Sequence, residues 1–386
     1  MKRNRLFYYA AALLMSSGLL FSSCSDDDDK IPTPPEENKP DKEDETEQRR
    51  TTDEQFYANI FAHDILEYYY YWNEQITKDL VKLDPMTNTN PIKTVSEIKY
   101  HTFQNAERKD IDKWTMLTDN MAQFESGVAG VSTTFGYQPI TYRMREGSNE
   151  CISAIAFVYK DTPADKAGLK RGDLIYRVNG QPLTTENFKE LFSSNTVTIS
   201  IATLKQTPEG EFVITPTGKD VNMTAVNMYE DPVLLDSIYQ INDKKVGYLA
   251  YSSFDLTSIP KLIEISKKFK AEGVSELILD LRYNGGGYVI TENAMASMYA
   301  PQDVVDAGKI FEIEKYNKQL TQELNKEGET GKTPFHTEIR FKDNAGNTHA
   351  YSTKGANIGL NKIYGLISKN SASASEALLS GLMGAV

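Results

Sequence analysis

Two short phrases near the end of the sequence carry residue types that could together perform acyl-transfer chemistry. The first is Ser371–Glu376, in which serines alternate with alanines at a predicted strand-to-helix junction. A serine hydroxyl at a helix N-terminus lies in a positive field that favours developing negative charge. The second is Gly285–Gly287, where missing side chains let backbone N–H groups converge on one point. Together the phrases predict a nucleophile and an oxyanion site.

Each phrase also has a plainer interpretation. Ser373 or Ser375 can simply cap the helix that follows. A glycine-rich strand exit can bind phosphate, but a phosphate loop calls for Lys-Ser or Lys-Thr after its glycines. Tyr288-Val289 follows here instead. The presence of both phrases in one chain therefore favours the catalytic interpretation over capping or phosphate binding.

The elements that must position these phrases form a predicted α/β unit over residues 227–386. Val246–Tyr251 reads as a strand, and Ser258–Lys270 has the apolar stripe of an amphipathic helix. Leu277–Leu279 is continuously apolar, as a covered parallel strand would be. The glycines follow this strand, so the sequence predicts them at its carboxyl end.

A second predicted unit, residues 127–226, contains six strand-like runs around the phrase Thr162–Gly180. Pro163 can start a single helical turn and Gly168 can end it in a left-handed conformation. Asn179-Gly180 is the signal of a type I′ hairpin. The whole phrase resembles a PDZ domain.

The PDZ resemblance implies binding of extended peptide C-termini, with the ligand carboxylate held on backbone amides. It places the carboxylate loop near Thr134, Phe135, Gly136 and Tyr137. A PDZ domain used only as a structural hinge is the alternative, because a fold alone does not specify function.

The order of these features resembles the C-terminal processing peptidases, also called tail-specific proteases. The resemblance runs from about residue 53 to the end, and rests on Asp280–Gly287 and Ser371–Glu376. It implies a serine endopeptidase without a cofactor. Its implied site residues are the nucleophile Ser373, the oxyanion donors Ala374 and either Gly286 or Gly287, and a supporting Glu376.

The general base of that family is a lysine some two dozen residues beyond the serine. The printed sequence ends at Val386, and Lys362 and Lys369 precede Ser373 and match no motif. We therefore expect a truncated chain that is inactive as written, because a serine without a base is a poor nucleophile.

Two other functions remain open from the sequence. One is an inactive surface lipoprotein that binds peptide C-termini through its PDZ domain. The other is a crotonase-like acyl-group enzyme, which the Ser371–Glu376 phrase argues against.

Residues 1–23 have the positive start and apolar stretch of a secretory signal peptide. Small residues before Cys24 resemble the lipobox of bacterial lipoproteins, which implies lipidation at that cysteine. Residues 24–50 form an acidic, proline-rich tether, and Asp26–Asp29 resembles the surface-export signal of Bacteroidetes lipoproteins. The prediction is an outer-membrane lipoprotein of the cell envelope, exposed at the surface.

Composition limits the remaining function classes. The 386 residues suggest two or three domains, and the net charge of −12 argues against a nucleic-acid partner. Two cysteines and four histidines without ligand spacing predict no metal site. Peptides or proteins are the expected partners, with the membrane contacted through the lipid.

The predicted fold class is multidomain α+β. Residues 51–125 are expected to form a helical N-terminal region, with the aromatic run Tyr68–Trp72 packed in its core. The PDZ domain follows, and then an α/β crotonase-like catalytic core, incomplete at its C-terminus.

Overall fold

The computed structural model describes residues 49–120, 130–208, 210, 212–343 and 346–385. The predicted signal peptide, Cys24 and nearly all of the tether lie outside these residues. The chain divides into two compact units, one made of Met1–Phe124 with Ala307–Phe335 and the other of Glu125–Asp306 with His336–Val386. Within the described residues, no helix has the length and apolar character needed to cross a membrane.

The first unit begins with helices, as the sequence predicts. They are α2 (Asp53–Tyr68), α3 (Asn73–Ile76), the 3₁₀ turn η1 (Leu80–Lys82) and α4 (Pro91–Ile98). Thr52 caps α2 in a reciprocal capping box with Gln55. Tyr70 belongs to the buried cluster of this unit and Trp72 packs against it, whereas Tyr71 is exposed, so the packing role predicted for the aromatic run holds for only part of it.

The region after α4 differs from the helical prediction. Strands β1 (His101–Gln104) and β2 (Glu107–Asp110) form an antiparallel hairpin. Asn105 and Ala106 turn the chain with φ of 51° and 64°. A two-residue turn of type I′ requires such positive values at both positions. The strands are almost wholly exposed, so no alternation of apolar and polar residues marks them in the sequence.

A segment from the predicted core, residues 307–335, groups instead with this first unit. It contains β14 (Ile310–Ile313), α11 (Lys318–Lys326) and β15 (Lys332–Pro334). Asn317 Nδ2 donates to Tyr68 O at 2.7 Å and to Tyr70 O at 3.1 Å. These bonds join the segment to the end of α2, which is distant in the sequence.

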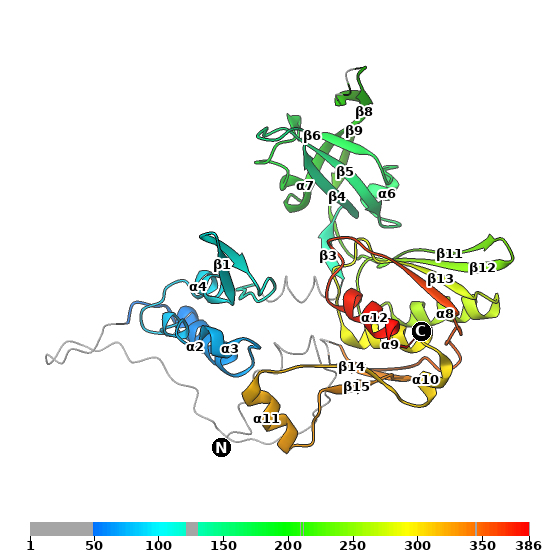
Figure 1. Cartoon of the computed structure of the whole chain (residues 1–386). Coiled ribbons are helices and arrows are strands. Elements are labelled where there is room, and N and C mark those ends of the chain that lie inside the picture. The colour runs from blue at the N-terminus through cyan, green and yellow to red at the C-terminus, as the bar shows by residue number, and fades with distance from the viewer. Residues whose placement is uncertain (1–48, 121–129, 209, 211, 344–345, 386) are drawn as a thin grey trace. The chain divides into compact units, whose positions relative to one another are not determined.

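The second unit contains the PDZ domain (Figure 1). Its sheet has the strand order β4-β5-β6-β8-β9, with β7 beside β6. The strands are β4 (Tyr137–Arg143), β5 (Cys151–Val158), β6 (Leu174–Val178), β7 (Gln181–Pro182), β8 (Thr196–Gln206) and β9 (Phe212–Thr224). Two short helices, α6 (Pro163–Lys166) and α7 (Glu190–Ser193), complete it. β3 (Val131–Thr134) precedes β4 in the chain and β10 (Val226–Tyr229) follows β9, and these two strands pair with each other.

The phrase that suggested a PDZ domain folds as predicted. Pro163 is the first helical residue of α6, behind the cap Thr162. Gly168 has φ of 70°, and Asn179 and Gly180 have φ of 49° and 76° at the turn between β6 and β7. Each special backbone conformation therefore falls on a residue that tolerates it.

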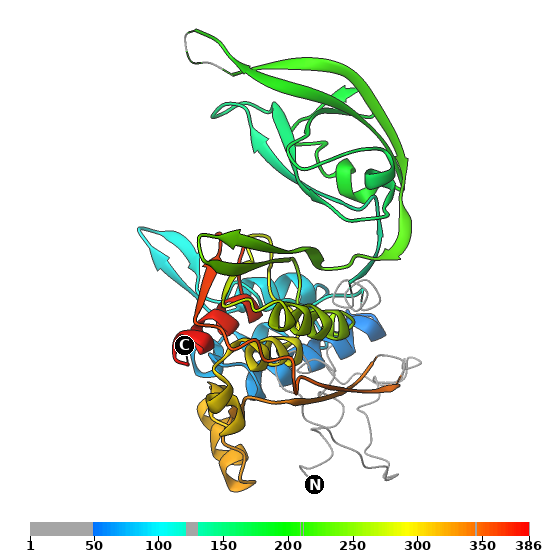
Figure 2. The same ribbon diagram turned by 90° about the vertical axis from the view of Figure 1, so that its right-hand side faces the viewer.

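The core sheet has the order β11-β12-β13-β18. Its strands are β11 (Val233–Ile241), β12 (Lys244–Tyr251), β13 (Glu276–Asp280) and β18 (Lys362–Leu366), the last three parallel. Helices α8 (Ile259–Ala271), α9 (Val289–Tyr299) and α12 (Ala374–Met383) lie along one face (Figure 2). Leu249, Leu277 and Leu279 are fully buried, but Ile278 is only half-buried, so β13 is covered on one face and not on both as the continuous apolar run predicts.

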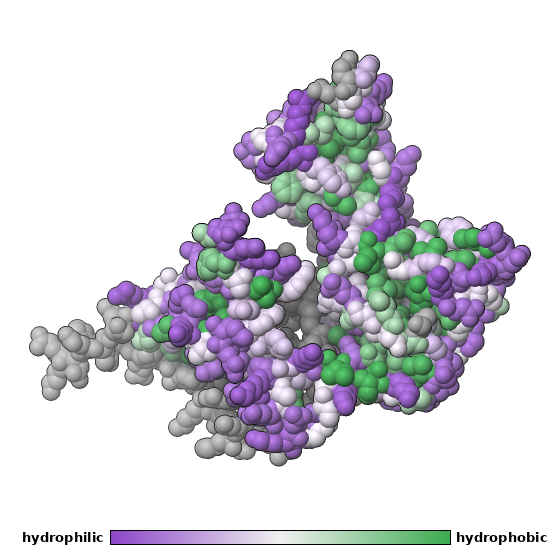
Figure 3. Space-filling view, viewed as in Figure 1, coloured by the Kyte–Doolittle hydropathy of each residue, from purple (hydrophilic) through white to green (hydrophobic). Residues whose placement is uncertain are grey.

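The opposite face of this sheet exposes apolar side chains, including Leu235, Ile241 and Tyr364. The space-filling view shows apolar surface over the region of β11 to β13 (Figure 3). A short helix, α10 (Gln302–Asp306), and a hairpin of β16 (Glu338–Lys342) and β17 (Thr348–Ser352) complete the unit.

Candidate active site

Ser373 lies at the junction between β18 and α12, immediately before the first helical residue. Its φ is 53° and its ψ is −123°. Such a conformation is strained for a residue with a side chain. A serine on a sharp strand-to-helix turn presents its hydroxyl outward, as nucleophilic serines do in other hydrolase folds. The side chain is exposed and makes no capping hydrogen bond, so the capping interpretation is wrong for Ser373.

The other serines around Ser373 use their hydroxyls to hold the glycine loop, defined here as residues 281–287. Each donates a hydrogen bond to a loop carbonyl: Ser368 to Arg282 O at 2.5 Å, Ser371 to Leu281 O at 2.7 Å and Ser375 to Asn284 O at 3.0 Å. Ser375 therefore does not cap α12 either. Ser373 is the serine of this stretch, within the described residues, whose hydroxyl makes no such bond.

Gly286 and Gly287 allow the loop to lie directly against its neighbours. Their φ values are 112° and 140°. Glycine adopts this region far more readily than other residues do. A Cβ on Gly286 would stand 2.6 Å from Ser373 Cβ, and one on Gly287 would stand 2.3 Å from Phe254 O. Ser373 can thus approach the loop only because Gly286 lacks a side chain, and the segment at Phe254 can approach it only because Gly287 lacks one.

Backbone bonds fix the same glycines to the segment after β12. Phe254 N–H donates to Gly286 O at 2.9 Å, and Tyr288 N–H donates to Phe254 O at 2.7 Å. The glycine loop is therefore held from two sides, by this segment and by the serines before and within α12.

The predicted oxyanion donors differ in availability. Gly286 N–H donates to Asn284 Oδ1 at 2.8 Å, so it is engaged within the loop. Ala374 is the first residue of α12, where a backbone N–H has no partner within the helix. Within the described residues, neither Ala374 N–H nor Gly287 N–H meets an acceptor. These two amides are the ones left for a developing oxyanion.

The remaining residues named from the sequence have no evident contact role, and Lys362 pairs with Glu276 at the end of the sheet opposite to the glycine loop. Glu376 is exposed in the first turn of α12, and its backbone N–H donates to Ser373 O at 2.9 Å. Lys362 lies over the ring of Tyr364 at 4.9 Å, and Lys369 is exposed.

Two buried carboxylates flank the glycine loop, and both form hydrogen bonds. Burial acts to raise the pKa of Asp280, but bonds from Arg282 and Tyr248 hold it below its usual range. Burial raises the pKa of Asp255 to about 6, against the effect of bonds from Ser258 and Tyr229. Both groups serve to fix the ends of strands rather than to face Ser373 in any contact of the described chain.

Sequence reasoning missed the roles of Asn284 and Ser375. Asn284 has no exposed surface and bonds through both ends of its amide, and Ser375 is equally buried. The sequence carried one signal for both roles. Asn284 and Ser375 are polar residues whose neighbours predict a buried loop, and a buried polar group needs a hydrogen-bond partner.

The residues predicted to hold a peptide carboxylate lie in the turn that enters β4. Phe135 and Tyr137 are buried in the PDZ core. Gly136 N–H donates to Thr134 Oγ1 at 2.8 Å, and a Cβ on Gly136 would stand 2.1 Å from Thr162 Cβ. Among the described strands, β4 pairs only with β5, so one edge of the PDZ sheet is open beside this turn.

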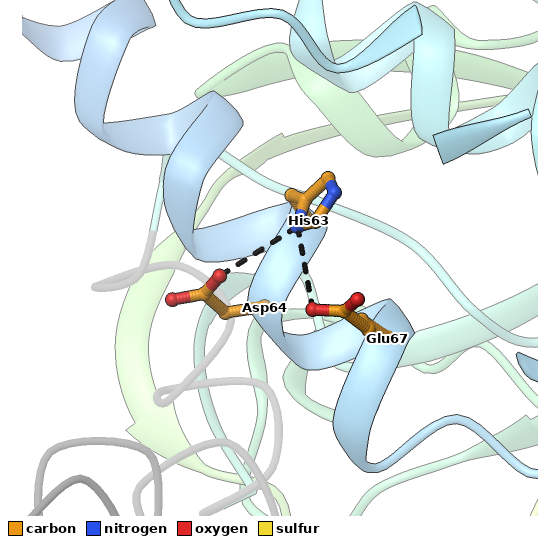
Figure 4. A group of neighbouring side chains, drawn as sticks. All are labelled: His63, Asp64 and Glu67. Carbon is orange, nitrogen blue, oxygen red and sulfur yellow. Dashed lines mark ion pairs between the residues drawn. The ribbon is translucent and has the colours of Figure 1, made fainter. Parts of the chain in front are cut away.

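One group of possible metal ligands occurs among the described residues, away from these phrases. His63, Asp64 and Glu67 lie together on α2, and His63 Nδ1 pairs with the two carboxylates at 3.6 and 3.9 Å (Figure 4). Neighbouring groups of this kind are ordinary on the surface of a helix, where residues four apart meet.

Comparisons with known proteins match both predicted domains. Residues 245–383 match the model of peptidase family S41, and residues 155–198 match a PDZ domain model. The carboxy-terminal processing protease CtpA of Bacillus subtilis is 26% identical over 183 residues, 47% of this chain and 36% of that protein. A protein of Staphylococcus epidermidis assigned as a CtpA-like serine protease is 23% identical over 210 residues, 54% of this chain and 38% of that protein.

The chain therefore spans little more than a third of the length of these curated relatives. A crystal structure of a Bacteroides fragilis protein assigned to the S41 proteases has a TM-score of 0.53 and 18% identity, and covers 84% of this chain and 76% of that one. This similarity shows the fold alone. The predicted mixed fold, with a PDZ domain and an S41 protease core, is confirmed. These matches support the similarity to C-terminal processing peptidases of family S41 that the sequence motifs predict.

Proposed function

We propose that the chain is the nucleophile-bearing part of a serine endopeptidase that acts by a Ser–Lys mechanism. The observation that carries the proposal is the uncapped, exposed hydroxyl of Ser373 against the side-chain-free Gly286. Residues 374–386 contain no lysine, so the proposal assigns the general base to a residue outside that stretch.

In the proposed reaction, Ser373 Oγ attacks the carbonyl carbon of the peptide bond as its proton passes to the base. The oxygen of the tetrahedral intermediate accepts hydrogen bonds from Ala374 N–H and Gly287 N–H. The proton then goes to the leaving amine, and water later releases the acyl group from Ser373. Removing one such oxyanion donor costs about 10²–10³ in rate in a serine protease.

A peptide boronic acid tests this site without requiring turnover. Boron forms a tetrahedral anion on a nucleophilic serine, and ¹¹B NMR reports its geometry. We expect the full chain to bind the boronate as a tetrahedral adduct and Ser373→Ala to lose that signal. Ser380→Ala, the same change at an exposed position of α12, is the control. An adduct that persists in Ser373→Ala would disprove the assignment.

Peptide binding by the PDZ domain is the second part of the proposal. It is supported by the open edge of β4, where an added strand would find unpaired backbone groups. Calorimetry with a peptide acid and its C-terminal amide tests whether a free carboxylate matters. Binding of the acid without any boronate adduct would favour the inactive, peptide-binding lipoprotein.

We further propose that Cys24 carries a lipid and that the protein lies on the outer surface of the outer membrane. The support is the signal-like residues 1–23 and the acidic residues 26–29 in the sequence. Cys24→Ala should release the protein from membranes. Its retention in the outer-membrane fraction at high salt would contradict the lipid anchor. Deletion of residues 26–29 should protect the protein from protease added to intact cells.

A further inference from the structure

We infer that Asn284 and Ser375 are positioning residues that hold the glycine loop against the first turn of α12. Through this contact they keep Gly287 N–H and Ala374 N–H aimed at one oxyanion. The inference rests on the proposed function and adds two residues that act through others.

Asn284 connects three parts of the site. Its Nδ2 donates to Tyr251 O, at the end of β12, at 3.1 Å. Its Oδ1 accepts Gly286 N–H at 2.8 Å, and its backbone O accepts the hydroxyl of Ser375 at 3.0 Å. The residue has no exposed surface, so water cannot replace any of these partners.

The side-chain amide is required at this position because it must donate at one end and accept at the other. Aspartate has the same shape but offers two acceptors when it is ionised. It would face the carbonyl of Tyr251 with an oxygen, and it would place a negative charge beside the site where an oxyanion develops. Asn284→Asp therefore changes the chemistry of the contact with little change in volume.

The bond to Gly286 also decides which amides of the loop remain available. Because Asn284 Oδ1 engages Gly286 N–H, that amide is turned into the loop. Loss of the bond would leave Gly286 held only by the bond from Phe254 N–H to its carbonyl, and Gly286 has no side chain to limit its conformation. The neighbouring Gly287 would then lose its fixed orientation.

Ser375 makes the corresponding contact from the helix. Ser375 is fully buried, and its hydroxyl, in the first turn of α12, donates a hydrogen bond to Asn284 O in the loop. Since Ala374 directly precedes it, this bond sets the distance between the Ala374 amide and the loop amides. A displacement of about 1 Å at such a site can cost a factor of about 10² in rate.

The test compares two affinities on the full chain. One is for the peptide boronic acid used above, whose tetrahedral anion occupies the oxyanion position. The other is for the same peptide without boron. In Asn284→Asp and Ser375→Ala we expect boronate affinity to fall by about 10- to 100-fold. Affinity for the plain peptide should change by no more than about twofold, because that peptide forms no tetrahedral anion for the two amides to bind.

Further measurements separate positioning from folding. Ser380→Ala should leave both affinities unchanged, and thermal unfolding should show that Ser375→Ala is folded. Because the two residues hold the same loop, the double variant should lose less than the sum of the single losses. If Asn284→Asp does not fold, Ser375→Ala decides the question.

Two results would overturn the inference, and they differ from each other. Folded variants that bind the boronate as tightly as the unaltered chain would reject the positioning role and leave the proposed function intact. Failure of the unaltered chain to form the adduct at Ser373 would reject the proposed function, and the inference with it.

Discussion

The glycine loop of the protease core and the turn that enters β4 of the PDZ domain contain the same type of hydrogen bond, from a glycine N–H to the side chain two residues earlier. In the core, Gly286 N–H donates to the side chain of Asn284, and in the PDZ domain Gly136 N–H donates to the side chain of Thr134, both at 2.8 Å. Both glycines have positive φ, 112° and 81°. Each turn therefore engages one glycine amide within itself.

The two turns differ in what lies against the glycine. A Cβ would stand 2.6 Å from Ser373 in the core and 2.1 Å from Thr162 in the PDZ domain. Ser373 is exposed, whereas Thr162 is fully buried and bonds to Tyr159 O at 2.7 Å. The same backbone geometry thus supports a candidate nucleophile in one domain and a packing contact in the other. The side chain that approaches the glycine, rather than the glycine itself, determines the role.

The largest expected effect is a loss of boronate affinity caused by a substitution at the glycine of the core turn. Gly286→Ala would place a methyl group within 2.6 Å of Ser373 Cβ. It would do so at a φ that alanine rarely adopts. Either Ser373 or the loop must move, so affinity for the peptide boronic acid should fall by at least about 100-fold. Calorimetry measures the loss.

Gly285→Ala is the matched control for that change, because nothing lies within 4 Å of its added methyl group. Its boronate affinity should change far less. Equal losses in the two variants would mean that loop flexibility, and not the approach of Ser373, governs the site.

The next effect, in the PDZ domain, should appear as lost stability without lost chemistry. The methyl group of Gly136→Ala meets Thr162 in a buried position. The positive φ costs alanine roughly 1–2 kcal/mol. Overpacking adds roughly 1–3 kcal/mol. Hydrogen exchange on the full chain should show faster opening of the PDZ strands, while boronate binding at Ser373 is retained.

Gly147→Ala isolates the strain in that experiment, since Gly147 also has positive φ, at 75°, but nothing within 4 Å of the added methyl group. It should cost only the smaller, conformational part. A boronate affinity that falls in Gly136→Ala alone would show that the two domains are coupled and would break the comparison.

The sequence predicted most of what depends on local signals. The PDZ phrase from Thr162 to Gly180, the buried strand before the glycine loop and the helix after Ser373 all carry their own turn, cap or periodicity cues. The phrases at Gly285–Gly287 and Ser371–Glu376 likewise identified the loop and the serine that the structure brings together.

The features that were missed depend on contacts between distant residues. Ser375 meets Asn284 across 91 residues, and Asn317 meets Tyr68 across 249, so neither bond has a local sequence signal. The hairpin of β1 and β2 was missed for another reason. Its strands bury almost nothing, and hydrophobic periodicity is the main signal of a strand.

The smallest expected effect comes from removing the side-chain acceptor of the glycine N–H in the PDZ turn. Thr134→Val removes the acceptor of Gly136 N–H with almost no change in shape. The bond from Gly136 N–H to Thr134 is partly buried, whereas the bond from Gly286 N–H to Asn284 is buried, so water has better access to the amide that loses its partner in the PDZ domain. The PDZ domain should therefore lose about 1 kcal/mol of stability or less. Thr134→Ser keeps the hydroxyl and should lose still less. Loss of the Asn284 acceptor in the core should cost more stability, because Asn284 is fully buried and the Gly286 amide left without a partner meets no water.

Thr134→Val also tests the PDZ ligand. The variant frees Gly136 N–H, so a peptide acid should gain affinity over its C-terminal amide if that turn receives the carboxylate. An unchanged preference in calorimetry would place the carboxylate elsewhere on the domain.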